Sequence, residues 1–335
     1  MADYKDIKGG TVQNFAGDPP APITGQVWYD STNVTFQYQF SSPEAWITGG
    51  NLNTARYALM GAGSQTAALA SAGTAPPGSQ VVTETYDGTS WTEVGDLNTT
   101  AEGRGGGGSN TSAVCAGGRL GPPGSTTNSE EWNGTSWTEG SNINGPRYNV
   151  RGTGVNNTAV LIAGGQNPGV SPYPAGQTGN TESYDGSSWT EVSDLNTVRN
   201  TGSMSGTNTA ALFAGGFNPG ISPTNRAETE SWNGSSWTEV SDLNRVAYGG
   251  AMFGTSTATI YGGGSPPDTT ALTEKWNGSS WTEVSDLNTG RYHIGYGTTG
   301  TTTAGIAIGG RTDAPVAITE EWSSPAAVTY TITTS

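Results

Sequence analysis

The chain has 335 residues and a formal net charge of −15 at pH 7, with 52 Gly, 18 Pro, one His and one Cys. The acidic balance excludes attraction to nucleic-acid phosphates, because that attraction needs clustered Lys and Arg. The single Cys excludes an internal disulfide and a thiolate metal cluster. No apolar run of roughly 18 residues offers a membrane span. We therefore expect the protein to bind no nucleic acid, metal or cofactor and not to insert into a membrane.

Residues 1–40 differ in composition from the rest of the chain. The opening MADYKDIKGG lacks the apolar stretch of a signal peptide, and residues 17–22 form the stiff polar stretch GDPPAP. Residues 25–40 read GQVWYDSTNVTFQYQF, which predicts two alternating strands around a turn at 30–33. We therefore expect an N-terminal extension with a hairpin at 1–40 and a second domain at 41–335.

From residue 46 onward the sequence repeats itself. The fullest copy, TESYDGSSWTEVSDLNT, spans 181–197, and similar copies begin at residues 83, 129, 229, 273 and, in decayed form, 319. The Trp of the Trp-Thr-Glu segment recurs at Trp91, Trp137, Trp189, Trp237 and Trp281, with spacings of 44 to 52 residues, and Trp46 fits one period upstream. A double Gly lies between most consecutive copies. Six units with this period predict a repeat architecture of six blades.

Each unit predicts four strands. An inner strand rich in Gly follows the Leu-Asn-Thr-x-Arg segment, and an apolar strand then ends on the double Gly. The third strand carries Thr-Glu-x-Tyr or Thr-Glu-x-Trp, and Asp-Gly or Asn-Gly joins it to the Trp-Thr-Glu-Val strand. These dipeptides predict tight hairpins in which both turn positions have φ > 0.

The last blade has two candidate outer strands. We favour the strand around Trp46, which would tie the two ends of the chain together and remove an exposed sheet edge. The alternative is the alternating segment VTYTITT at 328–334, which would leave the N-terminal strand outside.

These repeats resemble the kelch family of β-propellers, in which an apolar strand ends on Gly-Gly, an aromatic residue follows an acidic one, and Trp comes several residues later. The resemblance covers about residues 46–328 and implies an all-β, six-bladed kelch-like propeller with a short N-terminal hairpin. The segment GQVWYDST at 25–32 resembles a hairpin near the N-termini of bacteriophage tail and fibre proteins. The whole chain is similar to kelch-like virion proteins of marine tailed phages, whose N-terminal piece docks on the particle.

The sequence shows no catalytic equipment. Galactose-oxidase-like kelch enzymes use a Cys-crosslinked Tyr and two His ligands, whereas this chain has only His293 and Cys115. Serine-type catalysis also needs a His base, and we expect both residues to be ordinary strand residues. Carboxylates recur in equivalent places, and we expect them to pair with backbone N–H groups or Arg. They are Glu84, Glu130, Glu182, Glu230, Glu274 and Glu320, with Asp96, Asp194, Asp242 and Asp286.

Two sets of residues are candidate ligand contacts. Arg-Tyr pairs begin several inner strands and would form a basic aromatic ring at one mouth of the central channel; alternatively, each Arg bonds blade carbonyls or a repeat Glu. The connections after the double Gly vary in length, which is typical of recognition loops, and strand alternation places them on the same face. The predicted ligand-binding residues are Arg56, Arg147, Arg199, Arg291, Tyr173, Phe217 and Arg226.

These features predict a virion protein that is not an enzyme. We expect a tail-fibre or tail-associated propeller, present in several copies per particle, that contacts a host surface glycan or receptor. Residues 1–40 would bind other virion proteins, and the protein would assemble in the host cytoplasm. One alternative is a purely structural or decorating virion protein without a ligand. Another is a surface-polysaccharide hydrolase, which needs two facing carboxylates.

Overall fold

The computed structural model describes residues 12–22, 25–41, 43–121, 124–167, 176–265, 269–324 and 327–332. The chain forms two units, one of Met1–Glu44 with Ser324–Ser335 and one of Ala45–Ser323. Both consist of strands, and no helix long and apolar enough to cross a membrane occurs in the described ranges. The boundaries differ from the expected 1–40 and 41–335, because residues 41–44 and the C-terminal segment belong to the first unit.

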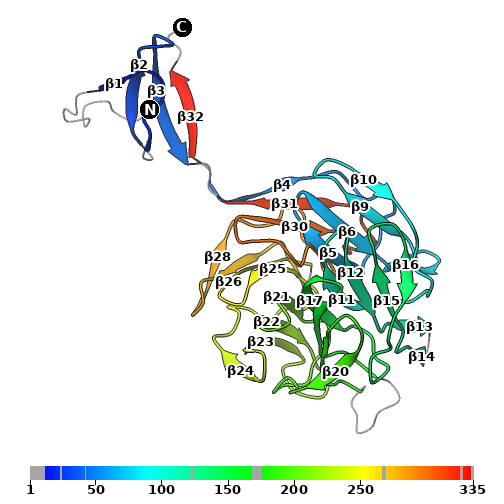
Figure 1. The fold of residues 1–335 in the computed structure, drawn as a ribbon. Helices are drawn as coiled ribbons and strands as arrows, with labels where there is room; N and C mark the ends of the chain where they lie inside the picture. Colours follow the sequence, from blue (N-terminus) through cyan, green and yellow to red (C-terminus); the bar gives the residue numbers. More distant parts are fainter. Residues whose placement is uncertain are drawn as a thin grey trace. The chain divides into compact units, whose positions relative to one another are not determined.

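In its described residues, the unit Ala45–Ser323 contains six four-stranded sheets, which we call blades 1 to 6 in chain order (Figure 1). Neighbouring strands of each blade pair antiparallel in the predicted order from first to fourth. The first strands contact one another around a common axis. This arrangement is a β-propeller, as the repeat predicts.

The strands of the blades have the following bounds. The first strands are β5 (Met60–Ser64), β11 (Gly105–Gly108), β17 (Arg151–Asn156), β21 (Ser203–Gly206), β25 (Ala251–Thr255) and β29 (Gly295–Tyr296). The second strands are β6 (Ala67–Ser71), β12 (Ala113–Ala116), β18 (Ala159–Ala163), β22 (Ala211–Phe217), β26 (Ala258–Gly262) and β30 (Ala304–Ile308). The third strands are β9 (Thr83–Tyr86), β15 (Ser129–Trp132), β19 (Thr181–Tyr184), β23 (Asn225–Trp232), β27 (Thr273–Trp276) and β31 (Thr319–Ser323). The fourth strands are β10 (Trp91–Glu93), β16 (Trp137–Glu139), β20 (Trp189–Val192), β24 (Trp237–Val240), β28 (Trp281–Val284) and β4 (Ala45–Thr48).

The N-terminal strand β4 completes blade 6, which confirms the favoured closure. It pairs antiparallel with β31, with Trp46 opposite Trp322. The Trp46 side chain is buried, its ring centroid lies 5.4 Å from that of Trp322, and its Nε1–H donates to Thr273 Oγ1 of blade 5 (3.1 Å). Strands from the beginning and end of this unit therefore share one sheet.

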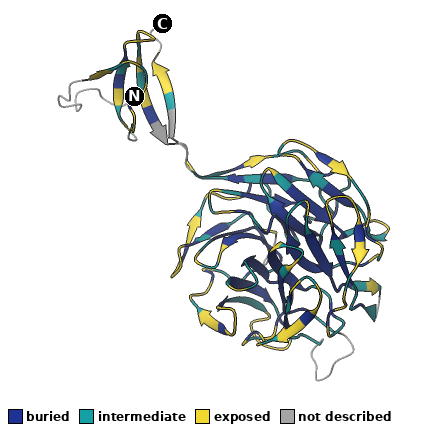
Figure 2. Ribbon diagram, in the orientation of Figure 1, coloured by how far each residue is buried: buried dark blue, intermediate teal, exposed yellow. Residues whose placement is uncertain are grey.

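Buried residues concentrate on the inner strands of the blades (Figure 2), and the hydrophobic clusters join side chains of neighbouring blades. Trp189, for example, belongs to a buried cluster with Val114 of blade 2 and Ile162 of blade 3. Fourth-strand indoles also donate to the preceding blade, from Trp91 to Thr319 (3.0 Å), Trp137 to Thr83 (2.9 Å) and Trp237 to Thr181 (3.2 Å). The repeated Trp is therefore core, and it joins adjacent blades.

The hairpins after the third strands differ from the predicted tight turn. Four residues separate the paired Tyr86 and Trp91, and Gly88 has φ 92° while Asp87 has no positive φ. The Asp87 carboxylate accepts hydrogen bonds from the backbone N–H groups two and three residues on, both at 2.8 Å. The prediction of two positive-φ positions is wrong because the Asp or Asn side chain itself forms the turn with these N–H groups.

The described residues of the unit that contains both chain ends form a four-stranded sheet. Its order is β1 (Gln13–Phe15), β2 (Val27–Asp30), β3 (Thr35–Ser41) and β32 (Ala327–Ile332). β2 and β3 form the predicted hairpin, and β32, the alternative closing strand, pairs with β3 rather than with a blade. The Asn33 side chain and three backbone N–H groups donate to the Asp30 carboxylate and hold its pKa below the ordinary value.

In the described ranges, small antiparallel ribbons lengthen two of the connections after the second strand. They are β7 (Thr74–Ala75) with β8 (Gly78–Ser79), and β13 (Arg119–Gly121) with β14 (Gly124–Ser125).

Candidate functional site

A buried carboxylate in each blade organises the entry to the inner strand. In blade 1, Glu84 accepts hydrogen bonds from the backbone N–H and Nδ2 of Asn53 (2.7 and 2.9 Å) and from Arg56 Nη2 (3.0 Å). Asn53 Nδ2 also donates to the Trp91 carbonyl (2.9 Å). The Leu-Asn-Thr-x-Arg segment is thereby fastened to the third and fourth strands of its own blade, which confirms that the repeat Glu pairs with Arg and backbone N–H groups.

The four arginines predicted to bind a ligand belong to this network. The pairs are Arg56–Glu84, Arg147–Glu182, Arg199–Glu230 and Arg291–Glu320. All four guanidinium side chains are at most 2% exposed. A buried guanidinium already paired with a carboxylate is poorly placed to meet a ligand, so the structure argues against this role for Arg56, Arg199 and Arg291. Arg147 lines a pocket of about 280 Å³, and its role in ligand binding stays a prediction. The alternative, pairing with the repeat Glu and blade carbonyls, is confirmed.

Six residues with left-handed backbone surround the axis, one at the entry to each first strand. They are Ala58, Gly103, Asn149, Thr201, Gly249 and His293, with φ from 52° to 68°. Backbone hydrogen bonds link neighbouring blades here, from the N–H of Ala58 to the carbonyl of His293 (2.9 Å), from Gly249 to Thr201 (2.8 Å), and through four further bonds. The six blades are thus joined in a closed circle at this level.

The residues beside this circle define one face of the propeller, which we call the ring face. The residue before each left-handed residue pairs with the residue after the double Gly of the same blade, as in Tyr57–Thr74, Asn200–Phe217 and Tyr292–Arg311. The inner-strand entries and the variable connections therefore share a face, as strand alternation predicts.

An arc of aromatic side chains crosses the ring face. It consists of Phe217, Tyr248, Tyr292, His293 and Tyr57, from blades 4, 5, 6 and 1, and we call it the aromatic arc. Ring centroids lie 5.8 Å apart for Phe217–Tyr248, 6.0 Å for Tyr248–Tyr292, 4.8 Å for Tyr292–His293 and 5.9 Å for His293–Tyr57. Every member is half-buried, so the arc is packed and still open to solvent. The Tyr half of the predicted Arg-Tyr ring is therefore present at the surface, whereas the Arg half is not.

The three candidates on the variable connections have different outcomes. Phe217 is a member of the aromatic arc. Arg226 donates through Nε and Nη2 to Glu228 and through Nη1 to the Pro223 carbonyl, so its guanidinium is held by its own loop, and its role in ligand binding stays a prediction. Tyr173 lies outside the described residues.

Arg311 is a cation of the ring face without an ion pair in the described part of the chain. Its guanidinium carbon lies 5.2 Å from the ring centroid of Tyr57, whereas Arg119, placed similarly over Tyr148, is paired with Glu102. A pocket of about 350 Å³ opens beside it, lined by Tyr57, Thr74, Ala75, Pro76, Pro77, Gly78, Arg311 and Pro315. Guanidinium N–H groups, a phenol and stiff proline walls converge there, a combination suited to an anionic group carried on a ring.

The pKa values of His293 and Cys115 are both shifted away from neutral pH. Burial raises the pKa of the Cys115 thiol to about 11, which leaves it protonated and unreactive at neutral pH. Burial, together with the nearby charges of Arg151 and Arg311, lowers the pKa of His293 to about 3, so it is a weak base. The described residues also contain no group of three or more His, Cys, Asp or Glu side chains that could hold a metal ion.

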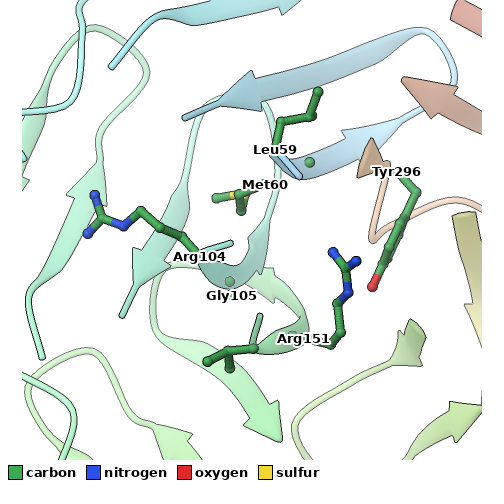
Figure 3. Close-up of a pocket in the computed structure, with 10 residues that line it drawn as sticks. Leu59, Met60, Arg104, Gly105, Arg151 and Tyr296 are labelled. Atoms are coloured by element: carbon green, nitrogen blue, oxygen red, sulfur yellow. The ribbon is translucent and has the colours of Figure 1, made fainter. Parts of the chain in front are cut away.

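One residue that sequence reasoning did not single out lies at the axis. Arg151 of β17 is 6% exposed and donates from Nε to the Gly202 carbonyl (2.8 Å). Figure 3 shows its guanidinium beside Tyr296 of β29, while Arg104 points away from both. The signal was available in the repeat, because the equivalent position is uncharged in the other blades. Those residues are Met60, Gly105, Ser203, Ala251 and Gly295.

Comparisons with known proteins bear on the fold alone. No family model matches the sequence, and no curated protein does. A solved structure titled "Structure of YjhT" is similar to this chain with a TM-score of 0.66 and 12% sequence identity, over 84% of this chain and 99% of that one. That structure is a kelch-like propeller. The chain is therefore a β-propeller by its strand pairing and by structural similarity.

Proposed function

We propose that this chain is a non-enzymatic binding module of a tailed-phage virion and that its ring face binds a glycan on the host surface. The observation that carries the binding role is the aromatic arc with Arg311 at one end. The apolar faces of sugar rings pack on aromatic side chains, and a free guanidinium can hold a carboxylate through two N–H groups. A neutral or acidic surface glycan has this combination of groups.

The binding at one ring face is weak in this proposal. Half-buried aromatic side chains and the pocket beside Arg311 offer limited contact, so we expect a dissociation constant from millimolar to micromolar, or about 4 to 8 kcal/mol. Several copies per particle would bind the host surface together, because linked sites raise the effective concentration of one another.

The other part of the proposal is that the unit containing both chain ends docks on further virion proteins. Phe36, Tyr38, Tyr330 and Ile332 lie opposite one another in β3 and β32, on one face of the sheet. Their side chains are 37% to 47% exposed, whereas Trp28 of the neighbouring strand is fully buried. Exposed apolar faces of this kind mark protein contacts. The choice of a virion as the partner rests on the resemblance of residues 25–32 to phage hairpins.

The test is adsorption of particles that carry the double variant Arg311→Ala with Phe217→Ala. We expect adsorption to fall roughly tenfold or more, because two anchoring groups are lost from each of several linked sites. Val155→Ala is the matched control, since Val155 is 45% exposed at the opposite end of β17. Unchanged adsorption with a folded double variant would favour the structural alternative. Release of reducing sugar ends from host polysaccharide would favour the hydrolase.

A further inference from the structure

Arg151 carries a buried positive charge that no carboxylate balances. Its side chain is 6% exposed, and within the described residues its guanidinium makes one hydrogen bond, to the Gly202 carbonyl, and no ion pair. By contrast, Arg104 is buried against Glu130 at 2.9 Å. Burial of an ion without a partner costs several kcal/mol even after the protein relaxes. A negative charge next to Arg151 would therefore stabilise the folded protein.

The titratable groups around Arg151 do not supply that charge. The Tyr296 and Tyr261 phenol oxygens accept hydrogen bonds from the backbone N–H groups of Met204 (3.1 Å) and Gly250 (3.3 Å). Burial raises the pKa of both phenols above the ordinary value, so both are neutral at pH 7. His293, whose pKa Arg151 helps to lower to about 3, is neutral as well.

The space beside Arg151 is small. A cavity of about 10 Å³ lies between the inner strands of blades 1, 2, 3 and 6, and Arg151 and Tyr296 are among its lining residues (Figure 3). A cavity of this size holds about one water molecule. Among anions, a monatomic ion is the closest in size to this space.

We propose that Arg151 binds one small monovalent anion of halide size, chloride in ordinary buffers, on the axis of the propeller. The anion neutralises the guanidinium and accepts hydrogen bonds from those of its N–H groups that do not donate to the Gly202 carbonyl. Arg151 is the one charged residue at its position in the six repeats, so the site is a departure from the repeat rather than part of the scaffold. The inference does not depend on glycan binding or on the virion.

The first experiment locates the anion in the full-length protein. Crystals grown with bromide in place of chloride are measured at the bromine absorption edge. We expect one anomalous peak within hydrogen-bonding distance of the Arg151 guanidinium in the wild type and none there in Arg151→Met. Met occupies the equivalent position in blade 1 as Met60, so the substitution preserves length and removes the charge. A wild-type map without this peak would overturn the proposal, and so would a peak that persists in the variant.

The second experiment measures the effect of the anion on folding. The denaturant midpoint is followed as chloride replaces gluconate at constant ionic strength. At chloride near 100 times the dissociation constant, the folded-to-unfolded ratio of the wild type should rise roughly 100-fold. Arg119→Met, which removes a half-exposed cation elsewhere, should respond like the wild type, and Arg151→Met should not respond. Equal chloride dependence in all three proteins would contradict the site, and so would no chloride dependence in the wild type. If Arg151→Met does not fold, the bromide map of the wild type alone decides.

Discussion

At the scale of single residues, the titratable side chains that are unusual in this propeller lie where one unit departs from the other five. The circle of left-handed residues holds small or amide side chains in five blades and an imidazole in the sixth, at His293. That imidazole packs within the aromatic arc, and burial together with the charges of Arg151 and Arg311 disfavours its protonation. Its titration therefore links the stability of the propeller to pH.

We expect His293→Asn to reduce the loss of stability at acid pH. Because the pKa of His293 is about 3 in the folded protein and 6.5 ordinarily, the unfolded chain binds more protons between these values, and stability falls as the pH falls through this window. One such group contributes up to about 1.4 kcal/mol per pH unit. Asn is suitable because Asn149 occupies the equivalent position with φ 54°. Denaturant unfolding at pH 7, 6, 5 and 4 measures the slope, and equal slopes for the two proteins would rule out this role.

At the scale of the element, an Arg pairs with the repeat Glu in each of the six blades. This Arg comes from one of three positions in the repeat. Four blades use the Arg three residues after the Asn, blade 2 uses Arg104, six residues after its Asn, and blade 5 uses Arg245, directly after its Asn. The blade 5 pair is the loosest, with 3.7 Å between Arg245 and Glu274. Burial accordingly raises the pKa of Glu274, since its Oε1 has no hydrogen-bond donor.

We expect the double variant Arg245→Thr with Ala247→Arg to stabilise blade 5. It recreates the Asn-Thr-Val-Arg segment of residues 196–199, in which Arg199 donates to Glu230 at 2.6 Å. Changes toward a consensus add about 0.5 to 2 kcal/mol to the free energy of unfolding. Arg245→Thr alone is the control and should lower it, because Glu274 loses its cation. If the double variant is no more stable than this single variant in chemical denaturation, the guanidinium cannot replace Arg245 from position 247.

At the scale of the whole molecule, the closure of the propeller depends on a strand from the other end of the sequence. β4 supplies the outer strand of blade 6. Asn288 Nδ2 donates to the Trp46 carbonyl (3.0 Å), as Asn53 Nδ2 donates to the Trp91 carbonyl in blade 1. The same chain ends also continue into the separate sheet of β1, β2, β3 and β32.

We expect residues 45–323 to fold as an intact propeller and residues 50–323 not to. The first truncation keeps β4 and should change the free energy of unfolding by less than about 1 kcal/mol. The second removes the buried Trp46, which alone should cost about 3 to 5 kcal/mol. Tryptophan fluorescence during denaturant unfolding measures both. Equal stability of the two truncations would show that β4 is dispensable, and incorporation of residues 45–323 into particles would argue against docking through the removed unit.

Much of the fold was predictable because it is local or periodic. The six units, their four strands, the buried Trp and the 25–40 hairpin follow from patterns within one repeat or one segment. The closure by the strand around Trp46 followed from counting strands and from the instability of an open sheet edge. The Tyr residues and Phe217 of the candidate site were also predictable, because strand alternation decides on which face a connection emerges.

The sequence by itself determined the repeat, and the tertiary structure decided which side chains remain available. Arg56 and Arg311 are both arginines near the ring face, yet Arg56 meets a buried Glu from its own blade and Arg311 has no carboxylate partner in the described ranges. β32 alternates like a blade strand and pairs with β3, because alternation specifies a face and not a partner. Arg151 lies at the axis because six first strands converge there. Burial and pairing depend on what lies across a gap from distant parts of the chain, and no local pattern contains that information.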